Sequence, residues 1–345
     1  MANSGNISDP PGNGRPSMSL ETLAAEYAAR YGVAAGFCER YLRDRYVDRV
    51  GLDPTDFDAS LGPTEKLYLE YAFATNQRGA AALARHPRDE GAPRRVLDIG
   101  CGYGGTVRAF ADAGDVALGL EIDPQLAEYA ALNVEDLPGA EVRCADVMAA
   151  DPTTLGEFDL IFCSDVIEHV SDPDTLLRAV PRLLAPGGTF VMHVPNKDSI
   201  HQVLSDEHFC LFGFTLLGRQ EGRELKRQRQ KWDDPYHHMG QLLPLPYYES
   251  RLRETGLEVG TEVAHWIAKR EGALERLGEA LKKMEEVQSD STLSWFTKRA
   301  LAEAFARYVN EFMTAWCEAN FSGDERAFAR RFVAPTWTVS AMRVA

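Results

Sequence analysis

The chain has 345 residues, about two domains' worth, with 37 Lys and Arg against 52 Asp and Glu and a formal net charge of −15. Hydrophobic residues make up 45% of it, which is typical of a globular protein and excludes a disordered or fibrous one. The negative balance disfavours binding to nucleic acid or to an anionic membrane, because clustered cations bind phosphate groups. No apolar run approaches the roughly 20 residues that span a bilayer, and no apolar segment follows a basic N-terminus.

Cysteine usage points to a reducing compartment. The six cysteines are scattered and form no CxxC pair, so we expect free thiols and a cytoplasmic protein.

The sequence predicts helices in the N-terminal part of the chain. Residues 1–18 are rich in Gly, Pro, Asn and Ser and are expected to form a disordered tail. Ser19 is a candidate N-cap for a first helix that Gly32 ends, and a second helix is predicted over 34–50. Pro63 opens a third helix that ends near His86. These helices form a predicted cap over 19–90.

From Arg94 the pattern changes to short apolar runs that alternate with amphipathic segments. A helix is predicted over 175–184, ended by Pro186-Gly187-Gly188. The predicted strands cover 94–100, 115–122, 140–147, 158–165 and 187–195. This alternation predicts an α/β fold with a mainly parallel, Rossmann-like sheet that carries helices on both faces. Ligands of such sheets bind at the carboxyl ends of the strands.

A glycine loop and three acids lie at those strand ends. The loop follows the first strand, and its glycines allow a tight turn and a close approach to a ligand. Glu121 ends the second strand, where a carboxylate can accept hydrogen bonds from both ribose hydroxyls. Asp146 ends the third strand, where it can take an adenine amino group while the Val147 amide meets a ring nitrogen. The predicted cofactor residues are Asp98, Gly100, Cys101, Gly102, Tyr103, Gly104, Glu121, Ile122, Asp146, Val147 and Ser164.

The glycines alone also fit a nicotinamide-binding GxGxxG motif. However, Asp98 stands two residues before the first glycine, as in the DxGxGxG pattern of S-adenosylmethionine (SAM) methyltransferases, where it can interact with the cationic methionine end of SAM. Five segments, VLDIGCGYGG, GLEIDP, CADV, FDLIFCSDVIEHV and LLAPGG, resemble in order and spacing the class I SAM-dependent methyltransferases.

That resemblance covers roughly 94–268 and implies a seven-stranded sheet ending in an antiparallel hairpin. Residues 257–268 and 334–344 suit the sixth and seventh strands. The core would then comprise 91–269 and 333–345, with a helical insertion over 270–332. The insertion's apolar stripe predicts core packing against the N-terminal helices, and a lid over the substrate is compatible with that. The stripe comprises Leu301, Phe305, Tyr308, Phe312 and Trp316.

The fourth strand leads into Asp165, Glu168 and His169, which share a face in an α-helical turn. The motif resembles the E-x-x-E-H metal motif of ubiquinone-pathway O-methyltransferases and of small-RNA 2′-O-methyltransferases, where a downstream histidine completes the site. His238 is the preferred match for it, with His237 as the alternative. The resemblance implies a divalent cation, Mg²⁺ or Mn²⁺ before Fe²⁺ or Zn²⁺, which would lower the pKa of an acceptor hydroxyl. In a metal-free site, Asp165, His169 or His238 would be the general base.

Residues 196–240 are longer than a usual connection. They place His201, Asp206 and His208 on an expected helix, followed by an apolar block over 209–217. Substrate capping and packing on the core are equally good interpretations. A basic cluster over 219–231 is either a solvated face or a site for an anionic group of the substrate.

The sequence therefore predicts a SAM-dependent methyltransferase that acts on a hydroxyl of a small-molecule metabolite or sugar. The alternatives are an N-methyltransferase, an RNA 3′-end 2′-O-methyltransferase, or a SAM-binding protein without catalysis. We expect neither nucleic acid nor membrane as a partner, and the helical additions could support a homodimer.

Overall fold

The structure is a computed structural model that describes residues 18–88, 91–150, 152–230 and 242–344. The predicted N-terminal tail up to residue 17, and both His237 and His238, lie outside the described residues. Within those four ranges, no helix has the length and apolar character needed to cross a membrane.

The strands form one seven-stranded sheet in the order β3-β2-β1-β4-β5-β7-β6. Pairing is parallel between β1 and β4, between β4 and β5, and between β2 and β3. β7 lies antiparallel to both β5 and β6, which confirms the predicted C-terminal hairpin. The strands are β1 (Arg95–Ile99), β2 (Val116–Glu121), β3 (Ala140–Cys144), β4 (Phe158–Ser164), β5 (Leu184–Pro195), β6 (Leu257–Glu262) and β7 (Thr336–Arg343).

The chain divides into two compact units, each described here by itself. The first contains the residues up to 93 together with 101–144. Residues 101–144, which the sequence assigns to the core, therefore group with the N-terminal helices. The helices of this unit are α1 (Leu20–Tyr31), α2 (Ala35–Leu42), η1 (Arg43–Val47), α3 (Asp48–Val50), η2 (Pro54–Asp56), α4 (Phe57–Ser60), α5 (Pro63–Phe73), α6 (Thr75–Arg85), α7 (Gly105–Asp112) and α8 (Pro124–Val134).

The first unit has an aromatic core. Tyr41 lies with its ring centroid 5.3 Å from that of Phe73 and 5.5 Å from that of Tyr129. Ser19 caps α1 by accepting a hydrogen bond from the Thr22 amide, and Gly32 ends the helix in the left-handed conformation, both as predicted. The predicted third helix is in fact two helices, because the backbone turns at Ala74 between α5 and α6.

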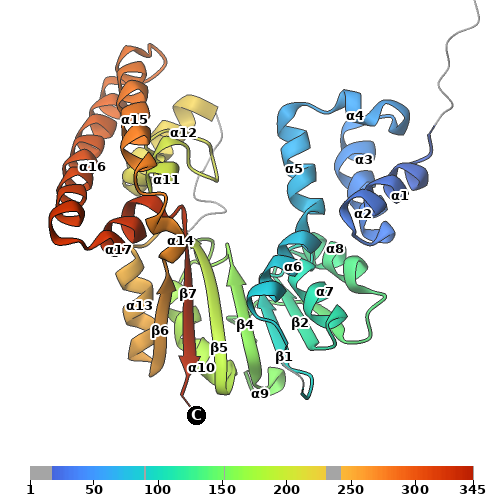
Figure 1. The fold of residues 1–345 in the computed structure, drawn as a ribbon. Coiled ribbons are helices and arrows are strands. Elements are labelled where there is room, and N and C mark those ends of the chain that lie inside the picture. The colour runs from blue at the N-terminus through green and yellow to red at the C-terminus, as the bar shows by residue number, and fades with distance from the viewer. Residues whose placement is uncertain (1–17, 89–90, 151, 231–241, 345) are drawn as a thin grey trace, which may run out of the picture. The chain divides into compact units, whose positions relative to one another are not determined.

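The second unit contains 94–100 and 145–345. In Figure 1 its longest helices, α15 and α16, stand side by side. Its helices are α9 (Pro152–Leu155), α10 (Pro173–Leu183), α11 (Ile200–Leu204), η3 (Phe214–Leu216), α12 (Arg219–Gln230), α13 (Leu245–Glu254), α14 (Ala264–Ile267), α15 (Gly272–Ser289), α16 (Trp295–Ser322), α17 (Glu325–Phe328) and η4 (Ala329–Val333).

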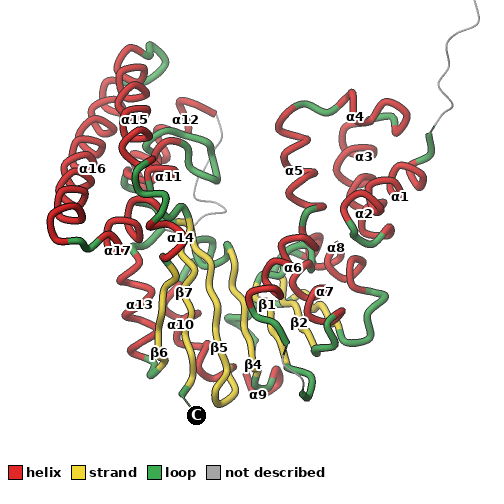
Figure 2. Tube along the Cα trace, viewed as in Figure 1, coloured by secondary structure: helices red, strands yellow, loops and turns green. Residues whose placement is uncertain are grey.

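Several boundaries differ from the sequence prediction. Pro186, Gly187 and Gly188 do not end the preceding helix but lie inside β5, beside a register irregularity of its pairing with β4. β6 ends at Glu262 and the short helix α14 follows, whereas the prediction extended the strand to 268. Figure 2 shows mostly loop between α11 and α12, where the prediction placed Asp206 and His208 on a helix.

The apolar stripe of the insertion packs on α11, which follows β5, and on α17 and η4, which precede β7. Phe305, Tyr308 and Phe312 share a buried cluster with residues of α11, α17 and η4. The predicted packing partner, the N-terminal helices, is thus replaced by segments of the second unit itself. The insertion is a continuation of the second unit's core.

Candidate functional site

The glycine loop starts at the end of β1 against the turn that follows β4. Gly100 has a φ of +69°, and a Cβ atom there would lie 2.4 Å from Cγ2 of Val166. Any other residue at 100 would be strained and would also displace Val166. The start of the loop and the turn at 165–169 are therefore packed directly on each other.

The rest of the loop is held by α6. A Cβ atom on Gly79 would lie 2.0 Å from the carbonyl oxygen of Gly105, so the two helices cross at backbone contact. The Gly105 amide also donates to Oγ1 of Thr75 at 3.2 Å. Gly104, with a φ of +76°, precedes α7. This close packing leaves the loop backbone little freedom, as a ligand-binding loop requires.

Glu121 is oriented by backbone amides at the end of β2. Its carboxylate accepts a hydrogen bond from Gly102 at 2.9 Å and one from Asp123 at 3.1 Å. The side chain is 6% exposed. Each carboxylate oxygen keeps a second lone pair, so the group can also accept from two hydroxyls.

The remaining predicted cofactor residues lie in different surroundings. Asp98 is buried on β1 opposite Phe162 of β4, whereas Asp146 is exposed and its carboxylate accepts from the Met148 amide at 2.8 Å. Ile122 is 67% exposed. Tyr103 stacks on Tyr129 at a centroid distance of 6.2 Å. Cys101 is buried and Val147 is half-buried.

The segment after β4 is a turn, which corrects the predicted helical face. Ser164 and Nδ1 of His193 share a hydrogen bond of 2.8 Å, and the Asp165 amide donates to the His193 carbonyl. Asp165 then adopts a φ of +55°, unusual for a residue with a side chain. Asp165, Glu168 and His169 therefore do not lie in one α-helical turn.

A compact cluster of possible metal ligands forms instead from Glu168, His169 and His208, whose ligand atoms all lie within 4.8 Å of one another. Glu168 is fully buried, and neither carboxylate oxygen has a hydrogen-bond partner in another described residue. The two imidazole centroids are 5.2 Å apart. Of the predicted ligands, Glu168 and His169 belong to this cluster and Asp165 does not.

Burial dominates the protonation of this cluster. It raises the pKa of Glu168 to about 8, and the negative charges of Asp165 and Glu207 add to that effect. Burial also lowers the pKa of His208 to about 4, with a contribution from His169. His208 is therefore neutral at pH 7, which is the form that binds metals.

The position of His208 is fixed by Asp206. The buried carboxylate of Asp206 accepts from the amides of His208 at 3.0 Å, Phe209 at 2.7 Å and Leu211 at 2.7 Å. The sequence motif favours a histidine just before α13 as the ligand, whereas His208 was expected only on a helix of the capping segment. The pattern Asp-x-His, in which an aspartate turns the chain, is the signal that could have indicated it.

The rest of the predicted capping segment packs within the second unit. Leu211 and Phe214 are buried together with Leu225, Val287 and Leu301, which favours core packing over a substrate cap.

The basic cluster is largely engaged by the protein. Arg227 pairs with Glu224 and Arg229 with Asp290, while Nζ of Lys226 lies 3.8 Å from the centroid of the Phe209 ring.

Comparisons with known proteins agree with this architecture. A family model described as a methyltransferase domain matches residues 68–262. The ubiquinone biosynthesis O-methyltransferase of Xanthomonas oryzae pv. oryzae is 36% identical over 106 residues, 30% of this chain and 44% of that protein. The enzyme of the same name from Thiobacillus denitrificans is 31% identical over 118 residues, 33% of this chain and 50% of that protein. The chain thus matches half or less of these relatives' length.

Among solved structures, phosphoethanolamine N-methyltransferase 2 of Haemonchus contortus in complex with S-adenosyl-L-methionine is 19% identical, with a TM-score of 0.45. The similarity covers 89% of this chain and 60% of that one. A SAM-dependent methyltransferase from Archaeoglobus fulgidus is 17% identical with a TM-score of 0.43, covering 80% of this chain and 98% of that one.

The family match extends over more than half of the chain, and the seven strands with an antiparallel last strand are those that the sequence motifs predict. The chain belongs to the methyltransferase-domain family and is a class I SAM-dependent methyltransferase.

Proposed function

We propose that this methyltransferase transfers the methyl group of SAM to a hydroxyl of a small-molecule metabolite or sugar, and that a divalent cation held by Glu168, His169 and His208 binds the acceptor. The ubiquinone-pathway relatives, named as O-methyltransferases, support transfer to oxygen. The acidic balance of the chain supports a small acceptor over RNA.

The carboxylate of Glu168 carries this proposal. A buried carboxylate without a hydrogen-bond partner destabilises a fold by about 1–3 kcal/mol or more, so its retention calls for a ligand. Glu168 is 0% exposed, and neither of its oxygens has a hydrogen-bond partner in any other described residue. The neutral imidazole of His208 beside it adds a second donor atom.

The donor set fits a transition metal better than Mg²⁺. One carboxylate and two imidazoles form a mixed oxygen and nitrogen set, which suits Mn²⁺ or Fe²⁺, whereas Mg²⁺ prefers oxygen ligands. The bound cation would supply Lewis acidity that lowers the pKa of the acceptor hydroxyl. Neighbouring acids at 165 and 207 add negative charge that favours a cation here.

The chain's own residues supply orientation. The turn that carries Glu168 packs on Gly100, so the cluster lies next to the start of the glycine loop. Asp206 fixes the backbone of His208. Backbone amides orient the carboxylate of Glu121, to which we assign the ribose hydroxyls of SAM. Holding acceptor and methyl donor in line supplies much of the rate of a displacement at carbon.

Metal binding by the purified full chain tests the proposal. We expect calorimetry to detect one Mn²⁺ site per chain, with affinity for Mn²⁺ above that for Mg²⁺. Glu168→Gln and His208→Ala should each weaken Mn²⁺ binding by at least tenfold. The matched control is His201→Ala, since the His201 ring bonds with Arg276 and lies outside the cluster.

An activity assay distinguishes a hydroxyl acceptor from an amine or an RNA end. Incubation of the protein with SAM and a panel of hydroxylated metabolites, read by mass spectrometry, should give methyl ethers in a reaction that EDTA stops. Methylamine products, methylated RNA ends, or turnover that EDTA does not change would contradict the proposal. Unchanged Mn²⁺ binding in Glu168→Gln would contradict the assigned ligands.

A further inference from the structure

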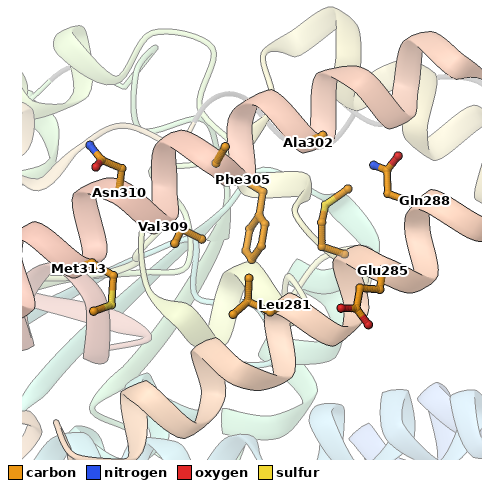
Figure 3. Close-up of a pocket in the computed structure, with 10 residues that line it drawn as sticks. Leu281, Glu285, Gln288, Ala302, Phe305, Val309, Asn310 and Met313 are labelled. Atoms are coloured by element: carbon orange, nitrogen blue, oxygen red, sulfur yellow. The ribbon is translucent and has the colours of Figure 1, made fainter.

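An apolar groove runs between α15 and α16, far along the chain from the cluster at Glu168. Its volume is about 690 Å³, and Figure 3 shows Phe305 between the two helices with Leu281 opposite it. Ala302, Val309 and Met313 also line the groove from α16. The helices bury one face in the unit's core and present a second apolar face to solvent.

Large apolar side chains are exposed in the groove and at both ends of α16. Leu281 is 48% exposed on α15 and Met313 is 38% exposed on α16. At the two ends of α16, Trp295 is 62% exposed and Phe321 is 90% exposed. Exposed apolar side chains around a groove are typical of a protein interaction site.

The spacing of residues on the outer face of α16 is symmetric. It carries Trp295, Arg299, Ala306, Asn310, Cys317 and Phe321, at successive spacings of four, seven, four, seven and four residues. These spacings place all six on one side of a helix. Because the series reads the same in both directions, a second α16 laid antiparallel across it brings Trp295 of each copy opposite Phe321 of the other.

The centre of this face is shaped for close approach. A two-fold axis between Ala306 and Asn310 places small side chains where the two helices cross. Ala302 and Ala306 line the groove. With the two-fold axis placed here, Met313 of the second copy lies beside these two alanines. A closed two-fold contact requires such self-complementarity, since the same patch serves both copies.

Charge and area also suit a second copy. In a chain of charge −15, the hairpin over 272–322 is nearly neutral, with six basic residues against eight acidic ones. Two such faces meet with little repulsion. At a rise of 1.5 Å per residue α15 and α16 are about 27 and 42 Å long, which with roughly 10 Å per helix gives about 700 Å² per copy. Stable interfaces bury around 800 Å² per partner.

We propose that the chain forms a two-fold homodimer in which the α15–α16 hairpins of two copies pack as an antiparallel four-helix bundle. Neither SAM nor a metal enters this interface, so the dimer is independent of the proposed function.

Light scattering coupled to size-exclusion chromatography of the full chain tests the dimer. We expect twice the monomer mass across the micromolar range. Leu281→Lys and Met313→Lys should shift the protein to monomer, because each places a charge in the groove. Glu286→Lys, on an exposed face of α15 away from the groove, should leave the dimer intact. A monomeric wild type, or a dimer that survives both groove variants, overturns the proposal.

Cross-linking tests the antiparallel arrangement. The arrangement sets Arg299 of one copy against the exposed Cys317 of the other. Arg299→Cys treated with copper phenanthroline, which oxidises the two thiols, should give a disulfide-linked dimer on non-reducing gels. The double variant Arg299→Cys/Cys317→Ser carries the same new thiol and should stay unlinked. Equal linking in both variants, or in neither, overturns the proposed packing.

Discussion

The buried carboxyl of Glu168 predicts a pH-dependent stability for the metal-free protein. In the folded state its pKa is about 8, against an ordinary value of 4.5. Between these pH values the folded protein holds a proton that the unfolded chain releases. The stability linked to this proton is fully present below pH 4.5 and is lost as the pH rises through 8.

The size of the effect follows from the shift. Between pH 4.5 and pH 8, each pH unit lowers the free energy of unfolding by about 1.4 kcal/mol. The total over this range is about 5 kcal/mol. The interval from pH 6 to pH 8 accounts for about 2.5 kcal/mol, because the carboxyl is already half ionised at pH 8. Glu168→Gln removes the titration while keeping the shape of the side chain, so its stability should exceed that of the wild type increasingly as the pH rises.

Thermal melts in EDTA measure this difference. From pH 6 to pH 8 the melting temperature of Glu168→Gln relative to wild type should rise by about 5 °C, at roughly 2 °C per kcal/mol. Glu224→Gln is the control, because Arg227 holds the pKa of Glu224 at about 2 and the carboxylate is charged throughout. If the Glu168→Gln difference is the same at both pH values, the buried carboxyl is not protonated and the reasoning fails.

Three further substitutions test Glu121, the contact between α6 and the glycine loop, and the loop that carries His208. Glu121→Ala removes the proposed acceptor for the ribose hydroxyls and should weaken SAM binding by about 10- to 100-fold in calorimetry. Gly79→Ala forces a Cβ against the Gly105 carbonyl and should destabilise the protein by about 1–3 kcal/mol in thermal melts, whereas Gly278→Ala, with open space at its Cβ, should not. Asp206→Ala leaves three amides without their acceptor and should weaken Mn²⁺ binding about tenfold; unaltered binding would show that the loop holds its shape without it.

Much of the fold could be predicted from local patterns. Alternating apolar strands and amphipathic helices have periods that the sequence displays directly, so β1 to β5 were found within a few residues. Glycines at 100, 102 and 104 all adopt positive φ, as the motif requires. These features depend on residues close in sequence, which is why a single chain reveals them.

The cluster at Glu168 could be predicted only in part. Its first two ligands are neighbours in sequence, but His208 joins them through a loop whose course depends on Asp206 accepting three amides. The helical-turn expectation for Asp165 failed because the residue takes a left-handed conformation that periodicity does not encode. Contacts between residues far apart in sequence decide the position of His208 and the conformation of Asp165. Such contacts also place the insertion's apolar stripe on α11 and not on the N-terminal helices.

The central claim is that a cation bound at this cluster holds the methyl acceptor. Anomalous diffraction from a crystal of the protein grown with Mn²⁺ tests it most directly. The account predicts one anomalous peak within bonding distance of a Glu168 oxygen and of a ring nitrogen each from His169 and His208. A crystal that takes up Mn²⁺ elsewhere while these three side chains remain without an ion would contradict it.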